Sequence, residues 1–235
     1  MMNVLIFLLS FTSIPDNADK DYQLVGKREY KYDENGLRSH KISFDSENQL
    51  EKMVQYFYDE QGNKIKTEKY NATHELIAVY KYQFNGKNQK INSSKTDYLK
   101  NKETGKLYFY DDTGKNSKTE YYFKNALLKT VEYAFNEFGH QVEYSAYNAK
   151  GEQSSLFYTE NKYDKTGKLL KKFKRGVAGK LVKLNHYIYN KESQIIESFS
   201  YYYTGKRGNS KRTYQYDTEG RKTGFFKYIA IETKH

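Results

Sequence analysis

The phrase Tyr-x-Tyr-Asp-x-x-Gly recurs along this chain and constrains its architecture more than any other feature. Clear copies lie at residues 30–36, 56–62, 108–114 and 214–220. Weaker copies fill the gaps, at residues 82–86, 135–139, 163–167 and 189–193. The anchor aromatic residues of successive copies are about 24 to 28 residues apart, and a period of this length predicts an array of one supersecondary unit rather than a conventional globular domain.

Each copy predicts a strand that ends in a tight turn. Aromatic residues two apart share one face of a strand because side chains alternate along it. Aspartate suits the first position of the turn, where its carboxylate can accept hydrogen bonds from backbone N–H groups ahead of it. Glycine suits the left-handed position that closes a bulged hairpin, so we expect a positive φ there. The predicted turn residues are Asp33, Gly36, Asp59, Gly62, Asp111, Gly114, Asp164, Gly167, Asp217 and Gly220.

A second turn is expected about halfway between neighbouring anchors. The predicted second turns are residues 45–48, 71–74, 102–105, 148–151 and 176–179. Aromatic and β-branched residues dominate between turns, and no window has helical periodicity. The predicted fold class is all-β, an elongated antiparallel β-meander of repeated hairpins with roughly 26 residues per two-strand repeat. About fifteen strands would form a single-layer or narrow solenoid-like sheet on the order of 70 Å long.

The composition indicates a folded protein with a thin core. The 26 Tyr and 14 Phe residues supply large side chains, but a mean hydropathy of −1.00 leaves little for a wide interior. The formal net charge is +11. Because lysine alternates with Glu, Asp and Tyr, we interpret this charge as solvation and protection against edge-to-edge aggregation rather than as a dedicated anion site. The chain has no cysteine, which excludes disulfides and a thiol nucleophile.

The N-terminus differs in composition from the rest of the chain. Residues 4–11 form a continuous apolar run, long enough for the core of a secretory signal and too short for a membrane-spanning helix. We expect residues 1–18 to be a short export signal or an N-terminal cap. Residues 19–235 would form a single β-hairpin repeat domain, with residues 222–235 as its C-terminal cap.

The repeated phrase resembles the YD repeat of bacterial Rhs and wall-associated proteins and of the related teneurin region. The best matches are residues 30–36, 56–62, 108–114, 163–167 and 214–220, and the resemblance covers residues 28–222. It implies exported or envelope β-structure that serves as a shell, spacer or binding surface. The chain is far shorter than the members that form large closed shells, so encapsulation is not expected. Bacterial MORN-type repeats are also similar, but the Tyr-Asp pair favours the YD repeat.

No residue pattern in the chain predicts catalysis. The five histidines do not form a metal-binding pair in sequence, and the turn aspartates are explained by the turns themselves. Residues 205–208 form a basic loop that we interpret as a plain hairpin connection. We therefore expect no enzyme activity, no cofactor and no metal site.

Tyrosine is the remaining candidate for recognition. Rings exposed in a row could stack on sugars or bases, although packing over neighbouring strands explains most of them equally well. The candidate binding residues are Tyr108, Tyr110, Tyr121, Tyr201 and Tyr203.

Three functions remain open. The sequence favours a non-catalytic bacterial repeat protein that is secreted, periplasmic or on the cell surface, and that acts as an adhesin-like or polymer-binding surface or as a spacer. Its partner would be a polysaccharide or another surface protein. The alternatives are a cytoplasmic interaction module of the antitoxin or immunity kind and, less favoured, a nucleic-acid-binding sheet.

Overall fold

The computed structural model describes residues 22–204 and 208–231, which form strands joined by short turns. A single 3₁₀ turn, Val177–Gly179, interrupts this all-β pattern. The strands are β1 Tyr22–Tyr32, β2 Arg38–Phe44, β3 Leu50–Tyr58, β4 Lys64–Asn71, β5 Leu76–Phe84, β6 Lys90–Asp97, β7 Lys102–Tyr110, β8 Asn116–Phe123, β9 Ala126–Phe135, β10 Gln141–Asn148, β11 Gln153–Tyr163, β12 Leu169–Arg175, β13 Leu181–Tyr189, β14 Ile195–Tyr202, β15 Ser210–Tyr216 and β16 Lys222–Ala230.

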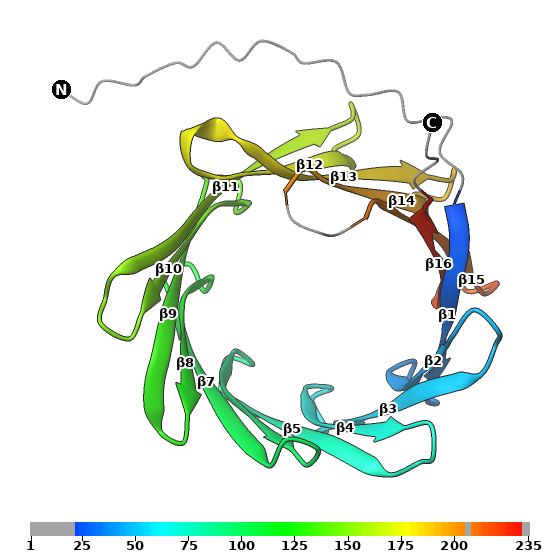
Figure 1. Ribbon diagram of the computed structural model, residues 1–235, viewed down its shortest axis with the longest axis horizontal. Coiled ribbons are helices and arrows are strands. Elements are labelled where there is room, and N and C mark those ends of the chain that lie inside the picture. The colour runs from blue at the N-terminus through cyan, green and yellow to red at the C-terminus, as the bar shows by residue number, and fades with distance from the viewer. Residues whose placement is uncertain (1–21, 205–207, 232–235) are drawn as a thin grey trace.

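The strands close into an antiparallel barrel (Figure 1). Each strand pairs with its neighbours in sequence, and β16 pairs with β1 in a register that runs from Tyr22 opposite Ala230 to Glu29 opposite Gly224. The prediction of an elongated open meander or a narrow solenoid-like sheet is therefore wrong, whereas the all-β class is confirmed. Twisted strands coil a long sheet back on itself, and pairing its two ends leaves no free edge. At usual strand spacing and tilt, sixteen strands give about 30 Å between opposite backbones.

One end of the barrel carries the YD turns, and we call this end the YD rim. The carboxylate Oδ1 of Asp33 accepts the backbone N–H groups of Asn35 and Leu37, and the N–H of Gly36 donates to the Asp33 carbonyl. The closing glycines have φ between +73° and +83°, as the pattern predicts. Where glycine is replaced, Asn88 and Ser193 adopt the same left-handed conformation.

The anchor tyrosines tie neighbouring repeats together at this rim. The Tyr58 hydroxyl donates to the Arg38 carbonyl at 2.8 Å, and the Tyr110 hydroxyl donates to the Lys90 carbonyl at the same distance. Tyr189 and Tyr216 make the corresponding bonds with Leu169 and Ile195.

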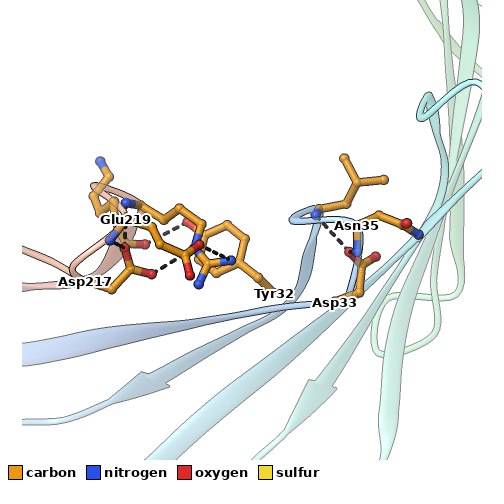
Figure 2. A network of polar contacts seen from close by, with 8 residues as sticks. Tyr32, Asp33, Asn35, Asp217 and Glu219 are labelled. Atoms are coloured by element: carbon orange, nitrogen blue, oxygen red, sulfur yellow. Dashed lines mark hydrogen bonds and ion pairs between the residues drawn. The ribbon is translucent and has the colours of Figure 1, made fainter.

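The same bond closes the ring where the chain ends meet. Tyr32 of the first repeat donates to the carbonyl of Lys222 in β16 at 2.7 Å. Figure 2 shows this junction, with Asp217 and Glu219 on one side and Asp33 on the other. The last strand thus takes the place of a preceding repeat, and the repeats become equivalent around the barrel.

One predicted second turn is wrong. Residues 102–105 belong to β7, and the turn lies just before them, where Asn101 has a φ of +45°. Gly105 pairs with Ser94 and Tyr122 inside the sheet, so this glycine occupies a strand position and not a turn. The predicted leader, residues 1–18, lies outside the described residues, as do residues 205–207 of the basic loop. The predicted C-terminal cap overlaps β16. Within the described ranges, no helix has the length and apolar character needed to cross a membrane.

Candidate functional site: the inner face of the barrel

The strand registers divide the side chains into two faces. Tyr30 lies opposite Lys41, Lys41 opposite Val54, and Val54 opposite Lys69, so these residues share one face. Cavities of about 290 and 450 Å³ are lined by residues of this set. We therefore identify it as the concave inner face and the opposite set as the outer face.

Small residues form the floor of the inner face. Side chains on a concave surface converge, so short ones alternate there with long ones. The buried floor residues include Val54, Thr67, Ala78, Ser93, Thr119, Val131 and Ala146. These residues form a thin buried layer on the inner face, and Phe173 and Leu184 are buried on the outer face.

Charge is divided sharply between the two faces. The inner face carries Arg28, Lys41, Lys52, Lys69, Lys95, Lys102, Lys106, Lys129, Lys172, Lys174, Lys183, Arg212 and Lys227. Among the strand residues that the structure describes, Asp97 is the only carboxylate on this face, and it pairs with Lys95.

The outer face carries the glutamates of the strands, and several of them form ion pairs with outer lysines or with Arg175. Lys27–Glu29, Lys66–Glu68 and Lys118–Glu120 each have a nitrogen–oxygen distance of 3.0 Å. Lys211–Glu197 and Arg175–Glu160 add two more pairs. The positive charge of the outer face is therefore largely compensated, whereas that of the inner face is not.

Inner cations lie over inner aromatic rings. Lys174 Nζ is 3.5 Å from the centroid of the Phe157 ring, and Arg38 lies 3.9 Å from that of Tyr30. Lys90 lies over Tyr108 at 4.3 Å. These cation–π contacts position the cations and cover ring faces that a ligand would otherwise use for stacking.

The ionisation of the inner groups reflects partial burial in a positive environment. Burial lowers the pKa of Lys41, and the neighbouring cations Arg28 and Lys52 lower it further. Burial also lowers the pKa of Lys174, with Lys183 adding to the effect. An anion placed here would relieve this repulsion, because opposite charge favours the protonated lysine.

The structure does not bring the five candidate tyrosines together. Tyr108 and Tyr121 lie on the inner face of adjacent strands, two residues apart in the register. Tyr110 lies at the YD rim, where its hydroxyl is bonded to a carbonyl. Tyr201 lies on the outer face and stacks on Phe199 at 6.3 Å between centroids. Tyr203 follows β14 and is 41% exposed.

Sequence reasoning missed the inner lysines, although a signal was present. In β7, Lys102 and Lys106 share the parity of Tyr110, whereas Glu103 has the opposite parity. Sorting Lys and Glu by parity relative to the anchors would have separated the charges. No group of three or more His, Asp or Glu residues suited to holding a metal ion occurs among the described residues.

Comparisons with known proteins do not assign a family. No protein-family model matches the chain, and no curated protein matches it significantly. Similar solved structures include a porin-like protein from Bacteroides uniformis, 9% identical, covering 89% of this chain and 96% of that one with a TM-score of 0.48. Another is a TcdB2-TccC3 chain without its hypervariable C-terminal region, 11% identical, covering 89% of this chain and 15% of that one with a TM-score of 0.27. At these values neither likeness identifies a function, and the YD-repeat resemblance stays an expectation.

Proposed function

We propose that this protein is a non-catalytic binding protein that works outside the cytoplasm and takes up an acidic polysaccharide on the inner face of its barrel. The observation that carries the proposal is the division of charge, with uncompensated cations inside and ion pairs outside. A concave wall of one charge sign concentrates the field and attracts counter-ions. A polymer can meet several weak sites at once, so its affinity would come from multivalency.

The aromatic contacts favour a ligand that is recognised by its charge. Nucleic acids bound without sequence preference rely on base stacking over open aromatic rings. Here Lys90 covers the Tyr108 ring, and Lys106 and Lys129 lie near that of Tyr121. An acidic polysaccharide needs the ammonium groups and not the ring faces.

The outer face supports an aqueous setting for the barrel. Lipid-facing barrel surfaces carry an apolar band, and charged residues there are costly at mid-membrane depth. Lys66–Glu68 and Lys118–Glu120 instead occupy the middle of outer strand faces. Water on both faces suits a soluble polymer as ligand.

Calorimetric titration with polygalacturonate tests the proposal. We expect binding that weakens steeply with salt, and none with neutral dextran. The triple change Lys172→Gln, Lys174→Gln, Lys183→Gln should weaken binding at least tenfold, because it removes adjacent inner cations.

The matched control makes three equal charge changes on the outer face. It is Lys31→Gln, Lys81→Gln, Lys171→Gln, and it should change the affinity less than about twofold. Equal losses in the two triples would show binding to net charge alone and would overturn the proposal. Tighter binding of single-stranded DNA than of polygalacturonate at the same salt would also overturn it, in favour of a nucleic-acid ligand.

A further inference from the structure

A cavity of about 290 Å³ lies on the inner face between β2 and β5. Its floor is Val54, which is 6% exposed, beside the hydroxyl of the buried Thr67. Tyr56, Tyr80 and Tyr82 form its walls. It is a shallow compartment with an apolar base and aromatic sides.

Three lysines surround the floor in a fixed arrangement. Lys41 and Lys69 lie directly opposite Val54 on the two adjacent strands. Lys52 precedes Val54 by two residues on β3 and so shares its face. Their side chains surround one small side chain and line the same cavity. Lys64 lies further along, with its Nζ 5.1 Å from the centroid of the Tyr56 ring.

The charge of this pocket is not compensated within it. The acidic residues of β2 to β5 are Glu51 and Glu68, and both point to the outer face. Glu68 pairs there with Lys66. Glu51 reaches Lys52 at 3.5 Å at the start of β3, so Lys52 is the partly neutralised member. Burial and surrounding cations lower the pKa of Lys41, as expected where like charges are held together.

We propose that this pocket is a subsite for a phosphate or sulfate ester group carried by a sugar unit of the bound polymer. The inference rests on the proposed function. It specifies which anionic group of the polymer binds to the part of the inner face between β2 and β5. A phosphate or sulfate ester group has three terminal oxygens that point in different directions, so lysines on different sides of the pocket can each reach one, whereas a carboxylate must share two oxygens among them. Lysine acts as a point charge towards such groups, and partial burial between the aromatic walls strengthens the attraction.

Titration of the full chain with glucose 6-phosphate, followed by ³¹P NMR, tests the subsite. We expect a saturable shift of the phosphate resonance. A calorimetric titration should show that glucose 6-sulfate binds as well and that glucose does not. Lys41→Gln and Lys69→Gln should each weaken binding at least fivefold. Lys81→Gln on the outer face of β5 is the matched control and should change the affinity less than twofold.

Two variants from different strands protect the test against a folding defect, which thermal melting would reveal. Failure of both esters to bind, or equal losses in Lys81→Gln and Lys41→Gln, would overturn the subsite. Polygalacturonate binding without ester binding would remove the subsite and leave the proposed function intact. Ester binding that depends on Lys41, without any binding of polymer, would support the subsite and overturn the proposed function.

Discussion

A single side-chain oxygen organises each YD turn. Asp111 Oδ1 accepts the N–H groups of Thr113 and Lys115 and the Thr113 hydroxyl. Asn85 and Asn190 make the corresponding bonds with their amide oxygens in other repeats. The geometry therefore depends on the oxygen, and the charge of the aspartate adds only a dependence on pH.

Acid should weaken the aspartate turns and spare the asparagine turns. Hydrogen bonds from Thr113 and Lys115 hold the pKa of Asp111 below its usual value, and bonds from Lys168 and Thr166 do so for Asp164. A depressed pKa in the folded state gives stability that is present above the unfolded pKa of about 3.9 and is lost as pH falls through the folded value. The double change Asp111→Asn, Asp164→Asn should lower the melting temperature slightly at pH 7, where the charged form adds stability, and flatten its fall below about pH 4. An equally steep fall in the variant would contradict this.

The anchor hydroxyls should contribute measurably to stability. Tyr58→Phe removes the bond to the Arg38 carbonyl and leaves that acceptor without its partner, at a cost of about 0.5–1.5 kcal/mol. Tyr147→Phe, on β10 away from the YD rim, is the control and should cost less. Urea unfolding at pH 7 measures both changes. Equal costs would mean that the anchor tyrosines act through their rings alone.

At the scale of the elements, the junction of β1 with β16 depends on close backbone approach. A Cβ atom on Gly224 would lie 2.2 Å from the Arg28 carbonyl oxygen, and one on Gly26 would lie 2.5 Å from that of Phe44. Gly26 also has a φ of +147° at the bulge in β1. Glycine at both positions lets the first strand fit between its neighbours.

Gly224→Ala should therefore disturb closure. The added methyl group meets backbone and must displace a strand, so we expect a loss of about 1–3 kcal/mol. Gly105→Ala is the matched control, because its Cβ would meet nothing closer than 3.9 Å in β7. Thermal melting should separate the two variants clearly. A Gly224→Ala variant as stable as Gly105→Ala would show that the junction can adapt.

At the scale of the whole molecule, local and non-local features differ in how far the sequence predicts them. The YD turns follow from Asp and Gly at fixed offsets, so turns such as Asp59 to Gly62 could be predicted from local chemistry. The pairing of Tyr22 with Ala230 joins the two ends of the described sheet, and no local pattern reports it. Without closure, the two faces of the sheet look alike, and the inner lysines were interpreted as solvating residues. Closure of the barrel places the face that carries Lys41 on the inside and the face that carries Glu51 on the outside.

An antiparallel ring requires an even number of strands. Ending the chain after Tyr216 removes β16 and leaves β1 and β15 running in the same direction, so they cannot pair as β1 and β16 do. We expect two open edges and association into dimers or aggregates, measured by light scattering and small-angle X-ray scattering. Ending the chain after Ile231 retains β16 and is the control. A stable monomer with the scattering of a hollow barrel after the first truncation would contradict the closed ring.

The equivalence of repeats around the ring makes copy number a determinant of size. The Tyr32 bond to Lys222 uses the same chemistry as the bond of Tyr58 to Arg38, so this hydrogen bond does not by itself fix the circumference of the ring. Duplication of one two-strand unit would preserve strand parity and widen the barrel by about 4 Å. A gene that gains or loses such a unit could thus adjust the calibre of the molecule in discrete steps, while each new unit brings its own turn and its own share of inner lysines.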